Sequence, residues 1–183
     1  MLCGLHVASC SNEQDAVYPN IVSELACIHT DSLGTMKRLV LDNDEGYDIS
    51  NNLTGYQPGA IYRVLCGYVI ANDKARIYQL EGCRFLSDST ASPRRDPVRI
   101  VSQWRTKHFL NLHLAPLTQG GRQYYGFIVD SLSIAHLPDG TADTTAFLSI
   151  HHNQNGDPLS YTADVYASIP LDSVKGQHVV LNK

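Results

Sequence analysis

From Val22 onward the chain consists of short strand-forming runs separated by turn residues, and this pattern constrains its fold more than any other feature. No stretch shows helical periodicity beyond one turn, whereas Leu110, Leu112 and Leu114 alternate with polar residues and would share one face of a strand. Val, Ile, Thr and the 10 tyrosines favour pleated, half-buried surfaces. The sequence therefore predicts an all-β fold.

The runs in the first half predict a small antiparallel barrel. Strands are expected at 22–30, 35–42, 46–50, 61–71 and 75–86. Asn72 and Asp73 supply a tight turn between the two longest runs. Five short strands in about 65 residues suit a small, partly open barrel, so we expect an OB-like barrel domain over 22–90.

A polar, proline-punctuated stretch from Ser87 to Pro97 predicts a domain boundary, because such residues do not belong in the middle of a sheet. Beyond it, strands are expected at 98–104, 108–115, 122–132, 144–152 and 160–169. The turns between them contain Gly and Asn, which tolerate positive φ. This spacing predicts an immunoglobulin-like β-sandwich domain with a C-terminal tail over 91–183.

The first 21 residues predict a lipoprotein signal remnant and a tether. Val7-Ala8-Ser9-Cys10 has the residue order of a bacterial lipobox, and polar residues follow it. The segment ahead lacks a positive region and is short, so an ordinary buried Cys10 before a tail is the alternative. Such a signal would export the protein, and lipidation of Cys10 would anchor it to the outer or inner membrane of the cell envelope without making it span the membrane.

Three cysteines remain beyond this segment: Cys27, Cys66 and Cys83. Their spacing matches no metal motif. Cys66 and Cys83 flank the predicted hairpin and could form a disulfide in an oxidising compartment. Three buried, reduced cysteines are the alternative.

Motifs for catalysis are absent from the sequence. It has no G-x-S-x-G elbow, H-E-x-x-H helix, P-loop or paired C-x-x-C. His151 and His152 are adjacent on a predicted strand and would point to opposite faces, so they cannot both coordinate one metal ion. We therefore predict no enzyme, no catalytic residue, no cofactor and no metal ligand.

Candidate ligand contacts are Trp104, Arg94 and Arg95. Trp104 is the only Trp and could stack on a sugar or fill a core or domain interface. Arg94 and Arg95 belong to a stretch over 84–107 that holds six of the 14 Lys and Arg residues. That stretch is either a solvated linker and strand edge or an anion-binding face.

The order of motifs in the second half resembles the NigD-like proteins of Bacteroidota. It has an Asp96-Pro97 ahead of a strand ending in Trp104, then Leu110-Asn111, then a strand end from His151 to Asp157. The resemblance covers about residues 22–172. It implies an N-terminal OB-like domain, a C-terminal β-sandwich, a lipoprotein signal and no enzymatic activity.

These observations predict a non-catalytic envelope lipoprotein that binds a cell-surface glycan or a protein partner, or serves as a scaffold. The alternative is binding of single-stranded nucleic acid by the barrel, through the basic stretch and Tyr62, Tyr68 and Tyr78. Export and a net charge of −4 argue against that alternative. A hydrolase whose site forms only in three dimensions is the remaining alternative.

Overall fold

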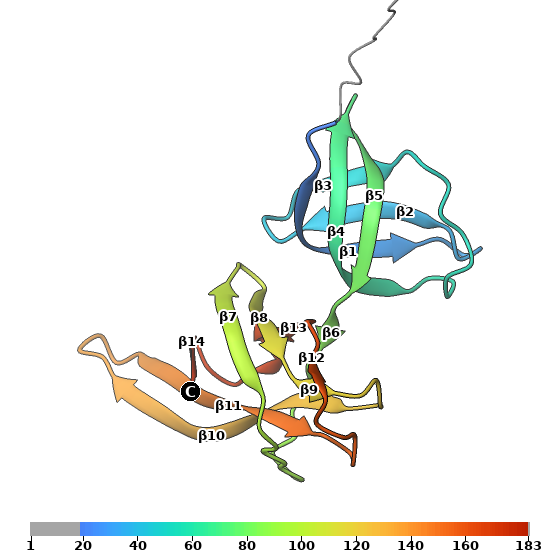
Figure 1. The fold of residues 1–183 in the computed structure, drawn as a ribbon. Helices are drawn as coiled ribbons and strands as arrows, with labels where there is room; N and C mark the ends of the chain where they lie inside the picture. Colours follow the sequence, from blue (N-terminus) through green and yellow to red (C-terminus); the bar gives the residue numbers. More distant parts are fainter. Residues whose placement is uncertain (1–18, 183) are drawn as a thin grey trace, which may run out of the picture.

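The computed structural model describes residues 19–182, which form a barrel followed by a sandwich of two sheets (Figure 1). The strands in chain order are β1 (Val22–Thr30), β2 (Met36–Leu41), β3 (Gly46–Ile49), β4 (Ile61–Ala71), β5 (Lys74–Gly82), β6 (Arg84–Phe85), β7 (Arg99–Arg105), β8 (Phe109–Ala115), β9 (Leu117–Thr118), β10 (Tyr124–His136), β11 (Ala142–Asn153), β12 (Tyr161–Thr162), β13 (Val165–Pro170) and β14 (His178–Leu181). Helical structure in this part of the chain is confined to a 3₁₀ turn, η1 (Leu171–Ser173), so none of its helices could cross a membrane. The predicted all-β class is confirmed.

β1 to β5 close into a barrel in the order β1-β2-β3-β5-β4. Alternate residues face its interior, so that Ala26 and Ile28 of β1 join the buried core. Tyr68 is also part of this core. The β4–β5 hairpin turns at Asn72 and Asp73, whose φ angles of 52° and 57° are those of a two-residue hairpin turn. The predicted five-stranded barrel is confirmed, but it is closed and not partly open.

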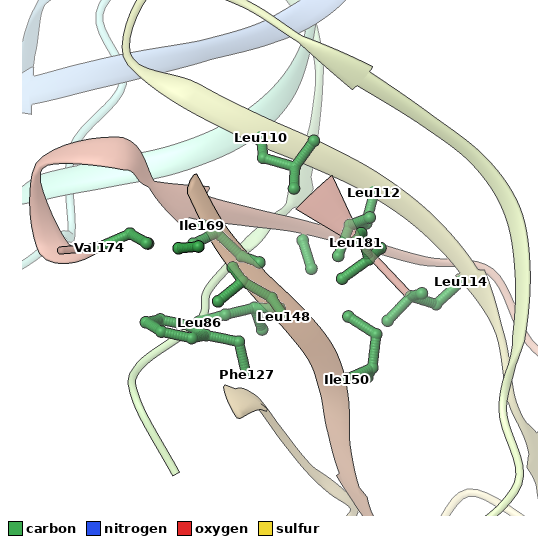
Figure 2. Close-up of a cluster of buried hydrophobic side chains, with 12 residues drawn as sticks. Leu86, Leu110, Leu112, Leu114, Phe127, Leu148, Ile150, Ile169, Val174 and Leu181 are labelled. Carbon is green, nitrogen blue, oxygen red and sulfur yellow. The ribbon is translucent and has the colours of Figure 1, made fainter. Parts of the chain in front are cut away.

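The second domain packs a four-stranded sheet, β6-β13-β8-β7, against a three-stranded sheet, β10-β11-β14. Its core contains the three alternating leucines of β8 and residues of β11 such as Leu148 and Ile150 (Figure 2). β14, which the sequence pattern did not predict, runs parallel to β11 and contributes Leu181 to this core. The predicted sandwich is therefore present, with strands of both sheets sharing one core.

The sandwich begins earlier than the predicted boundary at residue 91. Arg84 and Phe85 already pair with β13, so β6 is a strand of the sandwich and not the end of the barrel. The stretch Ser87–Pro97 is also no free linker, because Ser89 N donates to Phe127 O at 2.7 Å. Its polar composition suggested a spacer, but its backbone groups instead complete the hydrogen bonds of the sandwich.

β10 and β11 continue past the sandwich as a hairpin, shown in orange in Figure 1. A β-bulge between Val129 and Ser131 marks the point where β10 leaves the core. From Asp130 to His136 every residue of β10 is exposed. We call residues 131–145 the hairpin arm.

Candidate binding site

The most buried polar cluster joins the barrel to the sandwich and is centred on Arg63 of β4. Its guanidinium donates to both carboxylate oxygens of Asp42, at 2.5 and 2.7 Å, and to Ser168 and Asn111 of the sandwich, each at 3.1 Å. It also lies 4.0 Å from the centroid of the Phe109 ring. Burial alone would lower the pKa of Arg63, but the hydrogen bonds and charge of Asp42 raise it above its ordinary value. We call this cluster the junction; its polar atoms are committed to holding the two domains together.

A second polar cluster lies within the sandwich around Asp157. Its carboxylate accepts hydrogen bonds from Thr118 Oγ1 and from Gln123 Nε2, the latter at 2.7 Å. Gln123 Oε1 in turn faces His152 Nε2 at 2.9 Å and accepts from Tyr125 at 2.7 Å. Every buried polar side-chain atom in residues 19–182 has a partner. This cluster therefore orders the loops between strands and leaves no polar group aimed at a ligand.

A cleft of about 260 Å³ between the domains contains residue types that catalysis uses. Cys27, His29, Asp44 and His108 line it, and His108 Nε2 lies 2.6 Å from Asp44 Oδ1. However, the Cys27 sulfur accepts from Arg63 at 3.7 Å, and burial raises the pKa of its thiol. A nucleophilic cysteine needs a lowered pKa and an adjacent base, so the cleft does not activate Cys27. Within the described part of the chain, no group of three or more His, Cys, Asp or Glu residues is placed to hold a metal ion.

The predicted disulfide between Cys66 and Cys83 is wrong for this structure, because both are free thiols. Cys66 is fully buried in the barrel core, whereas the Cys83 sulfur lies 3.5 Å from Ser168 Oγ at the junction. The two thiols are thus on opposite sides of the barrel wall. The predicted lipidation site, Cys10, lies outside the described residues.

The structure does not bring Trp104 together with Arg94 and Arg95. Trp104 lies near the end of β7, opposite Asn111, and 38% of its surface is exposed. Arg94 and Arg95 precede the start of β7. Arg95 pairs with Asp130 at 2.7 Å, and the backbone N–H of Arg94 donates to His151 at 3.0 Å. A single ligand site containing all three residues is therefore not formed.

A groove does run along β7, and Arg95 lies at one end of it. Val98, Ile100, Val101, Ser102 and Gln103 line a hollow of about 420 Å³. A second hollow of about 380 Å³ shares two of these residues and is lined by Arg95, Asp96, Pro97, Val98, Ile100, Asp130, Ser149, Ile150 and Asn182. We call the two hollows together the β7 groove.

β7 is the outermost strand of its sheet, which gives the β7 groove an open strand edge. Within residues 19–182 it pairs only with β8, so backbone groups on its other edge remain open to a partner. Ile100 packs against the core at the floor, while Val101 is 42% exposed at a β-bulge. Arg99 and Arg105 lie at the two ends of the strand and have no carboxylate partner within the described residues. The groove thus combines apolar surface, free backbone groups and two cations without a carboxylate partner, of which Arg105 donates to Gln177 O at 3.5 Å.

Sequence reasoning predicted this strand but missed the groove. The run Val98-Arg99-Ile100-Val101 is strand-forming in any position, central or peripheral. β8 lies between β7 and β13, and this arrangement leaves β7 at the edge of the sheet. β13 is more than 50 residues further along the chain, so the local sequence does not reveal it. The two arginines that bracket the strand were the one available signal, because charges commonly protect edge strands.

Comparisons with known proteins agree with this fold. A family model described as NigD-like C-terminal beta sandwich domain matches residues 85–183. No curated protein matches the chain. A solved structure of a NigD-like immunity protein from Bacteroides caccae is 23% identical, with a TM-score of 0.67, over 90% of this chain and 86% of that one. A toxin-related protein from Parabacteroides distasonis is 17% identical, with a TM-score of 0.63, over 85% of this chain and 80% of that one. At these identities the neighbours show the fold alone, but the family model covers more than half of the chain, and the chain belongs to the NigD-like family.

Proposed function

We propose that this protein is a non-catalytic binding protein of the cell envelope, anchored through a lipid on Cys10, and that it holds a protein partner in the β7 groove. The observation that carries the proposal is the open edge of β7, with an apolar floor and, at each end, an arginine without a carboxylate partner. The segment that fits it is an extended stretch of polypeptide with acidic residues at its two ends. The bulge in β7 places Arg99 and Arg105 on opposite faces of the sheet. Such a segment would add a strand to the sheet and meet one arginine on each face with an acidic side chain.

A protein partner suits the β7 groove better than a glycan. The unpaired edge offers backbone N–H and C=O groups in the spacing that another extended chain provides. A sugar site needs an aromatic platform, but Trp104 lies near the end of the strand and does not line the groove. The descriptions of the structural neighbours as an immunity protein and a toxin-related protein also favour a protein partner.

Nucleic-acid binding has less support than it had from the sequence. Tyr68 is buried in the barrel core and Tyr62 packs against that core, so of the three barrel tyrosines only Tyr78 is exposed. The basic stretch is also dispersed, because Arg95 pairs with Asp130 and Lys107 pairs with Asp44. A stacking surface beside a continuous basic track is therefore missing from residues 19–182.

The test uses two synthetic six-residue peptides with the same interior of Val and Thr. One carries Asp at both ends and the other carries Lys, which places the charges five positions apart, as are Ala115 and Leu110, the residues of β8 opposite Arg99 and Arg105. We expect the Asp peptide to bind the full chain more tightly by fluorescence anisotropy. The double variant Arg99→Glu with Arg105→Glu should reverse the preference, since the attraction becomes repulsion. An Arg38→Glu variant of the barrel is the control and should keep the original preference. Equal binding of the two peptides, or no reversal, would contradict the proposal.

The second test identifies the site in cells. A photo-crosslinking residue at Gln103 should capture a defined protein, whereas the same residue at Tyr78 on the exposed barrel surface should not. Mass spectrometry of the crosslinked peptide should place the partner's contact in an extended acidic segment. Crosslinking to a glycan, or equal capture from both positions, would count against a protein partner in the groove.

A further inference from the structure

We propose that the hairpin arm is a homodimerisation element, in which β10 of one chain pairs antiparallel with β10 of a second copy. This interaction uses a different strand edge from the one proposed to hold a partner, because β7 and β10 belong to different sheets.

The arm presents an uncovered apolar face. Leu132 and Ile134 lie opposite Ala146 and Thr144 of β11, and Ala146 belongs to the sandwich core. Directly opposite residues share one face of a sheet, so Leu132 and Ile134 point to the same side as the core. Nevertheless they are 47% and 59% exposed, because the arm extends past the opposing sheet (Figure 1). This face has no partner among the described residues.

The arm also leaves a strand edge free. In residues 19–182 its β10 segment pairs only with β11. Nearer the core the same edge is covered, because Phe127 exchanges backbone hydrogen bonds with Ser87 and Ser89 at 3.0 and 2.7 Å. Beyond the bulge that cover ends. An exposed edge next to exposed apolar side chains is a template for pairing with another strand.

The sequence of this edge carries none of the usual protection against pairing. From Ser131 to Leu137 it contains no Lys, Arg, Asp, Glu or Pro, and His136 is its only titratable residue. Natural proteins place charges or prolines on edges that must stay unpaired. β7 differs, since Arg99 and Arg105 bracket it and a bulge interrupts it, so that it suits an acidic segment and disfavours a second copy of itself. The β10 edge carries no feature that would disfavour a like strand.

The occupant that fits is a second copy, because the arm is self-complementary. In a two-fold antiparallel pair centred on Ser133, Leu132 of each chain lies opposite Ile134 of the other. All four side chains then share one face and cover one another. A two-fold pair occupies the free β10 edge of each chain and leaves none for a third copy, so it forms a dimer and not a fibre. β7 could not do the same, since a two-fold centred on Ser102 would place Arg99 opposite Arg105.

Sedimentation velocity of the full chain across a dilution series tests the proposal. We expect a reversible dimer. Ile134→Lys should raise the dimer dissociation constant by at least about tenfold, because each copy then places a charged side chain opposite Leu132 of the other. Leu33→Lys is the matched control: it changes an exposed leucine in the barrel, 83% exposed, and should leave the dimer intact.

A crosslinking experiment fixes the register. Ser133 of the two copies would be opposite each other, at a separation that a disulfide can bridge. Ser133→Cys should therefore give a disulfide-linked dimer under mild oxidation, above the level of the unmodified chain. Ala135→Cys, on the same face but displaced from the two-fold, should not. A chain that is monomeric at every concentration, a dimer unaffected by Ile134→Lys, or equal crosslinking at both positions would overturn the proposal.

Discussion

Replacing Arg63 by Met should uncouple the two domains at the junction. The change removes two hydrogen bonds to Asp42 and one each to Asn111 and Ser168. It leaves the Asp42 carboxylate, only 11% exposed, without its cation. Breaking a buried ion pair by removing one partner costs about 3–5 kcal/mol. Because Asn111 Nδ2 still donates to Asp42 at 3.2 Å, we expect the lower end, about 3 kcal/mol of unfolding free energy.

Urea denaturation followed by circular dichroism measures this change. A loss of about 3 kcal/mol moves the midpoint down by about 1–2 M, given the usual dependence of stability on urea. Arg38→Met is the control: Arg38 pairs with Asp48 at 3.5 Å on the surface, so we expect a change within about 0.5 kcal/mol. The double variant Arg63→Met with Asp42→Leu should recover part of the loss, because it removes the carboxylate that Arg63→Met alone leaves without a cation. A loss below about 1 kcal/mol for Arg63→Met would refute the argument that this cation holds the junction.

Cys66 should resist iodoacetamide in the folded protein, because burial raises its pKa to about 12; rapid labelling of Cys66, detected by mass spectrometry, would contradict its place in the barrel core. The pKa of Asp157 is held below its ordinary value, chiefly by the hydrogen bond from Thr118, so its stabilising effect is complete above about pH 4 and is lost as the pH falls through the lowered value. Urea midpoints of Asp157→Asn and the unmodified chain should therefore differ at neutral pH and converge in acid, and a constant separation would rule this out. Gly34→Ala should lower the thermal midpoint well below that of Gly59→Ala: both positions have positive φ, but only at Gly34 would the new Cβ fall 2.1 Å from a backbone oxygen. Equal melting curves for the two variants would show that the turn at Gly34 adapts freely.

The sequence predicted those parts of the fold that local periodicity determines. The alternation of Leu110 and Leu112 identified the core face of β8, and Asn72-Asp73 identified the β4–β5 turn. Both features depend only on residues a few positions apart. The domain boundary was less well predicted, because β6 joins the sandwich by pairing with β13, more than 75 residues away.

The candidate sites depend on pairings that local pattern does not encode. Arg63 could be assigned to the outer face of the barrel, but its partners Asn111 and Ser168 lie 48 and 105 positions away. The Cys66–Cys83 prediction failed for a related reason. Cys66 points into the barrel and lies opposite Leu80 on β5. Cys83 lies beside Arg63, whose side chain is on the outer face of the barrel, so the two sulfur atoms cannot meet.

The polar character of the junction also has a consequence for how the chain folds. The barrel strands end at Gly82, so the barrel can form before the strand that carries Ser168 is in place. A barrel folded ahead of the sandwich would present the Arg63–Asp42 pair to water, which solvates an ion pair readily. An apolar surface at the same place would promote aggregation until the sandwich had formed. The polar junction therefore suits a barrel that must stay soluble until the second domain packs against it.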